Sequence, residues 1–450
     1  MKSLVLKRSM ITYLLFILIG CQSLPVISIG GSTFKIYELL GLILLMQGIK
    51  CRRMLFLQCC FFYFIIAPCL SLLWGWLVLG YPTGFFDYFV GNPELDSFKL
   101  NYYIFPVFCL IFMFANYCAI YGIVTNNWIY RNVHRVIRVF VYVGTVISLF
   151  SLLTIIGFDI RSILPAALYT SRGYIDVRSS GFSLEPSSYI IYQTWVVIFI
   201  LAIRNHFKGK LYWYAVLVLN LVSLFLTMSS SLIVFVIVLL LSPFFILKSS
   251  TKLKLSIIIF IVTIFIAGVS ILEYWGIYGD FIYIFQSKIE GFLTSRNYTT
   301  DSGSFRNYTS RIGIEIWKSS PLLGTGVSMS VYYMYIYEFA MGIDHFGEIL
   351  TPTTYPQNLI SQTLAETGLL GCIPLVILLA YTIIVLWKKR ESDRLVPYLL
   401  MGTLCNTAYF STNYTLYSFY LWVFIAFSAG YCLYIDQLHK KLTISVINNK

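Results

Sequence analysis

The apolar residues of the chain fall in long runs that are separated by short polar or charged connections. Most runs approach the length of about 20 residues that an α-helix needs to cross a bilayer. Twelve spans are predicted from this pattern, over residues 10–29, 35–49, 54–80, 101–124, 139–157, 187–203, 211–227, 231–247, 255–275, 359–387, 395–412 and 416–435. Runs of this length exclude a porin-type barrel, whose short strands alternate apolar with polar residues. The pattern therefore predicts an all-α polytopic membrane protein with about 12 transmembrane helices.

The N-terminus has a basic stretch followed by an apolar run, which is the order found in a signal peptide. A signal peptide ends its short apolar region at a small-x-small cleavage site. No such site follows here, and Pro25, Ile27 and Ile29 continue the apolar run. We therefore expect residues 10–29 to form a retained first span.

Composition and charge agree with this class of protein. The 450 residues are 58% hydrophobic and only 11% charged, whereas a soluble domain carries about 25% charged residues. This chain has too few charges to cover a water-facing surface of its size. The composition thus excludes a soluble enzyme and a disordered chain.

The net charge of +13 is distributed regularly along the chain. Most Lys and Arg residues lie in alternate connections between the predicted spans, where few Asp and Glu residues accompany them. These basic segments are 2–8, 50–53, 131–138, 204–210, 248–254, 388–394 and 440–450. Such an excess marks the cytoplasmic side of a membrane protein. We therefore expect both termini to be cytoplasmic, and a nucleic-acid partner is not needed to explain the charge.

Three segments on the opposite, outer side are long: 81–100, 158–186 and 276–358. Loops longer than about 12–15 residues are usually functional or disordered. The longest lies between the ninth and tenth spans and contains helical patterns, so we expect a folded outer domain. The chain would then divide into residues 1–275 with nine spans, 276–358 as the large outer loop, and 359–450 with three spans and a cytoplasmic tail.

The positions of the cysteine, histidine and acidic residues exclude several kinds of site. The ten cysteines lie in or beside the predicted spans and form no C-x-x-C pair, and the four histidines are scattered. This excludes a disulfide scaffold and a zinc site, and we expect no metal. Acidic residues such as Glu273 and Glu366 lie only near span ends. A transporter driven by protons is disfavoured, because it needs ionisable groups deep in the membrane.

The segment before the sixth span carries Arg172, Arg178 and Glu185. Ser183 is a plausible N-cap and Pro186 suits the first turn of the following helix. Glu185 would lie at the positive end of that helix. Anchoring at lipid headgroups with ordinary capping explains the same residues, and the pattern alone leaves both interpretations open.

The long outer loop predicts an amphipathic helix from Ser304 that Pro321 ends. Its apolar side holds Ile312, Ile316 and Leu322, and its polar side holds Arg311, Glu315 and Lys318; Arg306 lies near its start. A guanidinium grips phosphate with two parallel hydrogen bonds and keeps its charge. These arginines suit a lipid-linked pyrophosphate, although a solvated interfacial helix would carry them too.

The loop ends in a stretch, residues 351–358, that contains two prolines and is predicted to be extended before the tenth span. Gln357 and Asn358 are predicted at the N-terminus of that helix, where backbone N–H groups favour an anion. His345 lies a little upstream. A single loop histidine is more often incidental than catalytic.

Three motifs follow one another along the outer segments. The first is Arg178-Ser-Ser-Gly-Phe-Ser-Leu-Glu185-Pro186, and the second is Arg311 with Trp317 and Pro321-Leu-Leu-Gly324-Thr-Gly326. The third is Asn358-Leu-Ile followed by Leu364-Ala-Glu366-Thr-Gly-Leu-Leu-Gly371. Their order and placement, over roughly residues 172–390, resemble the superfamily of O-antigen polymerases (Wzy) and O-antigen ligases (WaaL). The resemblance implies a multi-pass enzyme of the bacterial inner membrane with a large periplasmic loop.

Two departures from the family pattern matter. Gln357-Asn358 stands where ligases often have His-Asn, and Ser229-Ser-Ser231 stands where they often have Ser-Arg. A glutamine amide cannot act as a general base, so the ligase histidine role has no counterpart at Gln357. The departures favour a repeat-unit polymerase over a ligase. A flippase for the same lipid-linked unit would need basic residues inside its spans and no large outer domain.

The resemblance also implies the chemistry. The donor would be a glycan on undecaprenyl pyrophosphate, whose leaving group arginines would neutralise, while a base takes the proton of the acceptor hydroxyl. The catalytic candidates are Arg178, Arg311, Glu185, His345 and Glu366, the last three as alternative bases, and the substrate-binding candidates are Arg172, Arg306, Gln357 and Asn358. The lipid-linked oligosaccharide and the bilayer are the partners, no cofactor is implied, and the involvement of a chain-length regulator stays open.

Overall fold

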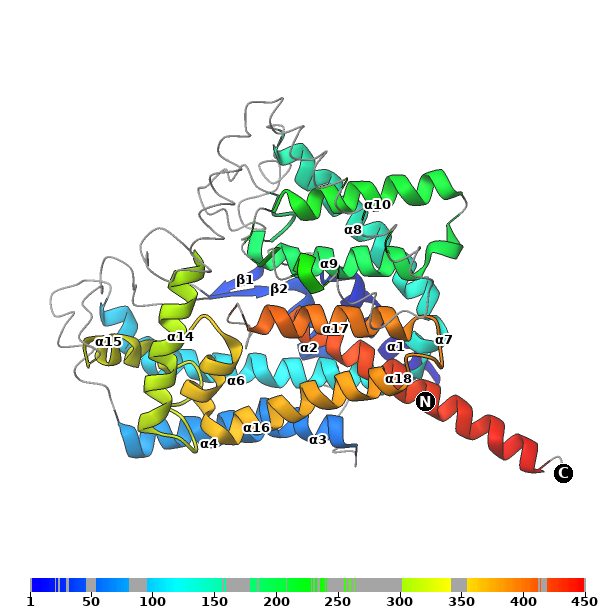
Figure 1. Ribbon diagram of the computed structural model, residues 1–450. Helices are drawn as coiled ribbons and strands as arrows, with labels where there is room; N and C mark the ends of the chain where they lie inside the picture. The colour runs from blue at the N-terminus through cyan, green and yellow to red at the C-terminus, as the bar shows by residue number, and fades with distance from the viewer. Residues whose placement is uncertain are drawn as a thin grey trace.

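The protein is a bundle of helices in a computed structural model (Figure 1). The structure describes residues 2–20, 22, 25–29, 32–45, 54–80, 95–155, 158, 179–183, 186–207, 209–227, 229, 231–232, 235–238, 240, 255, 259, 263, 302–340, 354–411, 413 and 419–448. The N-terminal part contains α1 (Lys2–Leu18), β1 (Pro25–Ile29), β2 (Ser32–Lys35) and α2 (Ile36–Leu45). A π-helical segment, Phe62–Ile66, joins α3 (Leu55–Phe61) to α4 (Ala67–Trp74), and a second, Gly75–Leu79, extends α4, so that Leu55–Leu79 form one continuous span.

The remaining elements of the described chain are helices. The middle part holds α6 (Leu95–Val124), α7 (Asn127–Arg131), α8 (Val133–Ile155), α9 (Pro186–Ala202), a short 3-10 turn (Arg204–His206) and α10 (Lys210–Phe225). The C-terminal part holds α14 (Ser302–Ser319), α15 (Ser330–Ala340), α16 (Leu359–Lys388), α17 (Val396–Phe410) and α18 (Phe419–Asn448).

Five helices among the described residues are long and apolar enough to cross a membrane: Leu55–Leu79, Tyr102–Val124, Val133–Ile155, Leu359–Lys388 and Phe419–Lys440. Three shorter apolar helices accompany them: Ser9–Leu18, Pro186–Ala202 and Lys210–Phe225. The predicted class, an α-helical membrane protein, is confirmed. The full set of twelve crossings stays a prediction, because more than half of span 231–247 and nearly all of span 255–275 lie outside the described residues.

The predicted first span is wrong in its second half. The helix α1 ends at Leu18, and residues Pro25–Ile29 form β1, which pairs antiparallel with β2 so that Ile29 faces Ser32. Pro25 has no N–H for a helical hydrogen bond, and the β-branched residues after it favour an extended backbone. Apolar character alone therefore mispredicted a strand as a helix.

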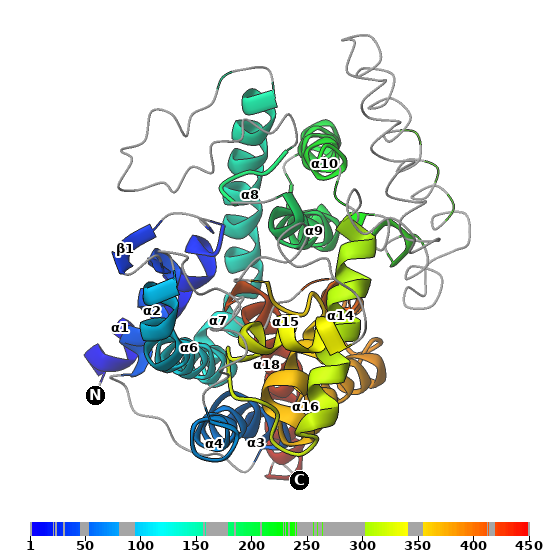
Figure 2. The same ribbon diagram turned by 90° about the vertical axis from the view of Figure 1, so that its left-hand side faces the viewer.

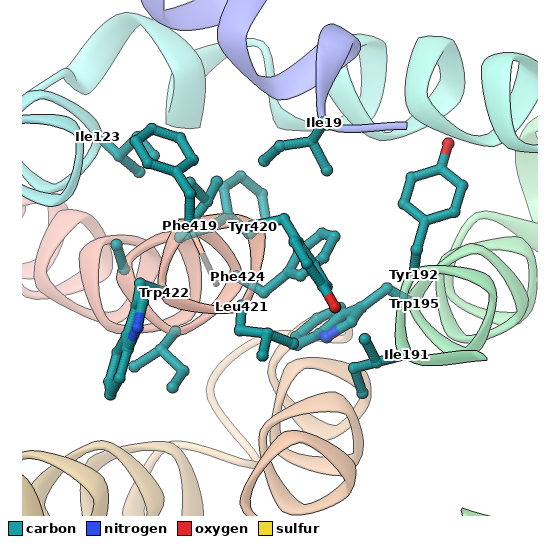
Figure 3. Close-up of a cluster of buried hydrophobic side chains, with 14 of the residues drawn as sticks. Ile19, Ile123, Ile191, Tyr192, Trp195, Phe419, Tyr420, Leu421, Trp422 and Phe424 are labelled. Carbon is teal, nitrogen blue, oxygen red and sulfur yellow. The ribbon is translucent and has the colours of Figure 1, made fainter. Parts of the chain in front are cut away.

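The core is built from aromatic side chains around α18, whose described residues from Phe419 to Cys432 are nearly all buried. Figure 3 shows Trp195 of α9 beside Phe424 of α18, and their rings stack with centroids 4.7 Å apart. The indole N–H of Trp195 donates to Asn406 Oδ1 on α17 at 3.0 Å. In lipid, such close packing and interhelical hydrogen bonds hold helices together, since lipid tails are as apolar as the side chains.

The helices α14 and α15 lie at one end of the bundle (Figure 1). There α14 runs crosswise over the ends of α9 and α16 and packs against α15 and α16 (Figure 2). We call this the α14 end. The start of α1 and the end of α18 lie at the opposite end.

Candidate active site at the α14 end of the bundle

The helix α14 has the predicted amphipathic form. Tyr308, Ile312 and Ile316 are buried against α15 and α16, whereas Arg311 and Lys318 are exposed. Lys318 pairs with Glu315 at 2.7 Å. The prediction for Leu322 is wrong, because this side chain is 70% exposed. Leu322 follows the end of the helix at Ser319, so helical periodicity does not set its direction.

A break interrupts α16 at Gly368, where the backbone has φ 60° and ψ −157°. In a continuous helix each N–H bonds to the carbonyl four residues back, which would join Leu369 to Ala365 and Leu370 to Glu366. The left-handed conformation of Gly368 separates both pairs. Two carbonyl groups and two N–H groups on α16 therefore need partners from elsewhere.

The turn between α14 and α15 supplies those partners. The N–H groups of Thr325 and Gly326 donate to the carbonyl oxygens of Ala365 and Glu366 at 2.8 and 3.0 Å. In return, Leu369 and Leu370 donate to the carbonyl oxygens of Pro321 and Leu322 at 2.9 and 3.0 Å. We call this exchange, between residues 320–326 and 365–370, the clasp. It joins the second and third sequence motifs into one structural unit.

Two glycines make the clasp possible. Gly324 has φ 69° and Gly368 has φ 60°, a region that side chains disfavour. An added Cβ on Gly324 would lie 2.4 Å from the carbonyl carbon of Glu366, and one on Gly368 would lie 2.5 Å from that of Leu322. Glycine is required at these two motif positions, because a side chain there would collide with the backbone of the opposite segment.

The carboxylate of Glu366 lies inside the clasp region and is wholly buried. It accepts hydrogen bonds from the Ser328 N–H at 2.9 Å, from the Ser330 hydroxyl at 2.8 Å and from the Gln362 side chain at 3.3 Å. The hydroxyl of Ser71 donates to the backbone carbonyl of the same residue. Glu366 therefore fixes the start of α15 against α16.

Tyr355 lies beside this carboxylate and shares a hydrogen bond of 2.8 Å with the hydroxyl of Ser328. Burial, together with the neighbouring Cys109 and Glu366, raises the pKa of the Tyr355 phenol well above its usual value. The phenol therefore stays protonated at neutral pH. It can donate a hydrogen bond but cannot serve as a general base.

Asn358 is the N-cap of α16, at the predicted place. Its side-chain oxygen accepts from the N–H groups of Ile360 at 2.8 Å and Ser361 at 3.3 Å. Its amide nitrogen donates to the carbonyl oxygen of Ser411, at the end of α17, at 2.7 Å. The N–H groups of Ile360 and Ser361, which were expected to face an anion, are therefore used by the cap. The bond from Asn358 to Ser411 also connects α16 to the end of α17.

The Asn358→Ala variant is expected to lose about 1 kcal/mol of stability, because the two capped N–H groups lose their acceptor. Thermal unfolding of the purified protein in detergent measures this loss. Asn358→Asp is the matched control, since aspartate caps equally well but cannot donate to Ser411. An unchanged unfolding midpoint in Asn358→Ala would contradict the capping role.

Arg306 contacts Ser231, which lies far from it in sequence. Its guanidinium donates to the Ser231 hydroxyl at 3.3 Å, and the side-chain amide of Asn413 donates to the same hydroxyl at 3.0 Å. Nearby along α14, the Gln357 N–H donates to the hydroxyl of Thr309 at 3.3 Å. The structure therefore brings three predicted substrate-binding residues, Arg306, Gln357 and Asn358, to the same end of the bundle.

The four remaining predicted site residues, Arg172, Arg178, Glu185 and His345, lie outside the described residues. The described part of the first motif begins at Ser179, whose N–H donates to the Leu226 carbonyl at 2.8 Å. The helix α9 begins at Pro186, as predicted. The hydroxyl of Ser183 donates to Gln22 Oε1 at 2.5 Å. The predicted capping by Ser183 involves residues 184 and 185, which lie outside the described residues.

The sequence reasoning missed a buried polar network that anchors the first motif. The hydroxyl of Ser179 shares hydrogen bonds with Ser151 on α8 at 2.6 Å and with Ser223 on α10 at 3.0 Å. Tyr189 on α9 and Asn220 on α10 extend the network through Ser148. Polar residues spaced three or four apart inside apolar runs, such as Ser148 with Ser151 and Asn220 with Ser223, were the available signal.

Within the described ranges, no three His, Cys, Asp or Glu side chains come together as metal ligands would. The described residues at the α14 end include hydrogen-bond donors and the guanidinium groups of Arg306 and Arg311. Such groups recognise phosphate and other anions.

Residues 215–376 match the model of the family described as O-antigen ligase. No curated protein matches the chain. The matched range contains most of α10, then α14, the clasp, α15 and the first half of α16. Members of this family are polymerases or ligases of the glycosyltransferase kind, and the match does not separate the two. Residues 215–376 of the chain are thus similar to the O-antigen ligase family.

Proposed function

We propose that the protein is an oligosaccharide repeat-unit polymerase of the bacterial inner membrane. It transfers a glycan from undecaprenyl pyrophosphate to the sugar of a second lipid-linked unit at the periplasmic face. The observation that carries this proposal is the family match over the region that forms the clasp. The orientation, with both termini in the cytoplasm, rests on the excess of basic residues in alternate connections.

The reaction needs two kinds of group. The acceptor hydroxyl attacks the anomeric carbon of the donor sugar, a glycosidic C–O bond forms, and the C–O bond to the pyrophosphate breaks. The pyrophosphate leaves with the bonding electrons, so guanidinium groups that neutralise it lower the barrier. Arg178 and Arg311 are proposed for that role, and a general base takes the proton of the acceptor hydroxyl.

The preference for polymerase over ligase rests on Gln357. Its side chain is an amide, which has no basic nitrogen, and it stands where ligases often carry histidine. Glu185 and His345 are proposed as alternative bases. Glu366 is proposed as a positioning residue, because its buried carboxylate accepts hydrogen bonds from Ser328, Ser330 and Gln362.

The Glu366→Gln variant tests whether Glu366 is a positioning residue or the general base. The amide would turn an N–H₂ group towards one of the donors that the carboxylate now accepts, which should cost about 2 kcal/mol of stability. Thermal unfolding and transfer activity are measured on the same preparation. A positioning role predicts that both fall together. A variant with an unchanged unfolding midpoint and no activity would instead identify Glu366 as the base.

Deletion of the gene tests the proposed function directly, with the surface glycan read on a gel. A polymerase is expected to give a ladder that collapses to core plus one repeat unit, because a single unit can still be exported and ligated. Loss of every repeat unit from the core would overturn the proposal and point to a ligase or a flippase. Restoration of the ladder by the intact gene is the control. Co-purification with a chain-length regulator would identify a further partner.

A further inference from the structure

The turn between α14 and α15 presents an apolar side chain at the surface. Leu322 is 70% exposed, and Pro321 beside it is exposed as well. The carbonyl oxygens of both residues accept hydrogen bonds from Leu369 and Leu370 in the clasp. Because these bonds fix the backbone, the surroundings of the turn decide what the Leu322 side chain contacts. We call residues 320–322 the apolar turn.

The surroundings of the apolar turn belong to two helices that are long enough to cross a membrane. The indole N–H of Trp74, at the end of α4, donates to the Ser320 hydroxyl at 3.0 Å. A Cβ added to Gly75, the next residue, would collide with the carbonyl oxygen of Thr325. On the other side, the clasp joins the turn to α16. In Figures 1 and 2, α14 accordingly ends at the edge of the bundle beside these two helices.

The depth of the apolar turn in a bilayer follows from the lengths of α4 and α16. An α-helix needs about 20 residues to cross the hydrocarbon core. Counted from Arg53, which precedes the span Leu55–Leu79, these residues end near Trp74. Counted back from Lys388, the last residue of α16, they end near Gly368. Trp74 and Gly368 both contact the turn, so two independent counts place it where hydrocarbon meets the headgroups.

The side chains around the apolar turn suit that boundary. Tryptophan is enriched where hydrocarbon meets headgroups, because its ring is apolar and its N–H is polar. The indole N–H of Trp317 donates to the carbonyl oxygen of Pro321 at 3.0 Å, so this indole and that of Trp74 both hold the turn. Apolar side chains are exposed further along both spans: Leu70, Leu73, Ile373, Val376 and Ile377. Leu322 therefore extends the apolar surface of α4 and α16 up to the clasp.

We propose that the apolar turn inserts into the lipid leaflet at the α14 end, with Leu322 among the first acyl carbons below the headgroups. Lipid is the occupant of this surface, because the turn lies between two helices of membrane-crossing length, where their hydrocarbon-crossing parts end. The contact holds α14 along the membrane surface, which is its direction across the bundle (Figure 2). Through the clasp, it also sets the height of the α14 end above the acyl chains.

Fluorescence quenching tests this contact on the full-length protein in nanodiscs of phosphatidylcholine. An environment-sensitive fluorescent amino acid replaces Leu322, and the quencher is either phosphatidylcholine brominated on its acyl chains or iodide in the buffer. The brominated lipid is expected to quench strongly and iodide weakly. The same label at Ile377, which is exposed within α16, gives the reference for lipid. The label at Ser392, exposed in the connection between α16 and α17, gives the reference for iodide.

Photo-crosslinking tests the same contact without a fluorescent label. Phosphatidylcholine with a diazirine on its acyl chain is expected to form adducts on residues 320–322, which mass spectrometry of the digested protein locates. Leu322→Asp should lose most of this labelling, because a carboxylate is costly among acyl chains, whereas Leu322→Met should retain it. The side chain is mostly exposed, so both variants should keep the unfolding midpoint of the wild type in detergent.

Three results would overturn the proposed lipid contact. The first is quenching at position 322 that equals quenching at Ser392 for both quenchers, since water would then surround the turn. The second is protection of position 322 from both quenchers, because protein, such as a second copy of the chain, would then cover it. The third is an absence of lipid adducts on residues 320–322. These measurements involve no sugar transfer, so their outcome is independent of the gene deletion.

Discussion

The Gly368→Ala variant is expected to lose at least about 3 kcal/mol of stability, because alanine is strained by roughly 1–2 kcal/mol in the left-handed region and the clasp hydrogen bonds are worth about 1 kcal/mol each. The new Cβ would lie 2.5 Å from the carbonyl carbon of Leu322. Backbone must therefore move on one side of the clasp, and its four hydrogen bonds cannot all survive. Thermal unfolding in detergent and the glycan ladder should both show the loss.

Gly80→Ala provides the matched control for this experiment. Gly80 also has a positive φ, of 72°, but no atom of the described residues lies within 4 Å of the position that a Cβ would take. Its substitution measures the backbone strain alone, and the difference between the two variants measures the cost of opening the clasp. Equal losses in the two variants would contradict the interlocked structure of residues 320–326 and 365–370.

The Arg311→Ala variant is expected to reduce sugar transfer about 100-fold or more, since one donor removed from a transition-state charge costs about 2.7–4 kcal/mol. The exposed position of Arg311 on α14 means that little packing is lost, so the variant should keep its stability. In cells, the glycan ladder should shorten while the amount of protein stays normal. The transfer rate of the purified enzyme gives the magnitude.

Lys318→Ala is the control for Arg311, because seven residues bring it back to nearly the same face of α14 and it is also exposed. This variant should retain polymer length. Arg178→Ala is expected to resemble Arg311→Ala, since both are proposed to neutralise the leaving group. If both arginine variants kept full polymer length at a normal protein level, the proposed mechanism would be contradicted.

Much of the fold could be predicted from local pattern. Apolar runs of membrane-crossing length indicated α9, α10, α16 and α18, and the periodicity of residues 304–319 indicated α14 with Ile312 and Ile316 inside. The place of Asn358 at the start of α16 was also predictable. The same reasoning failed at β1, because hydrophobicity alone does not distinguish a strand from a helix where proline and β-branched residues follow each other.

The sequence by itself determined the class of protein, the ends of several helices and the motifs of the superfamily. Those features depend on interactions between neighbours along the chain. Only the tertiary structure decided what the motifs do: Gly324 and Gly368 let two backbones exchange hydrogen bonds, Glu366 is buried, and Arg306 meets Ser231. These contacts join residues some forty to seventy-five positions apart, and no local pattern specifies which distant partner satisfies a buried polar group.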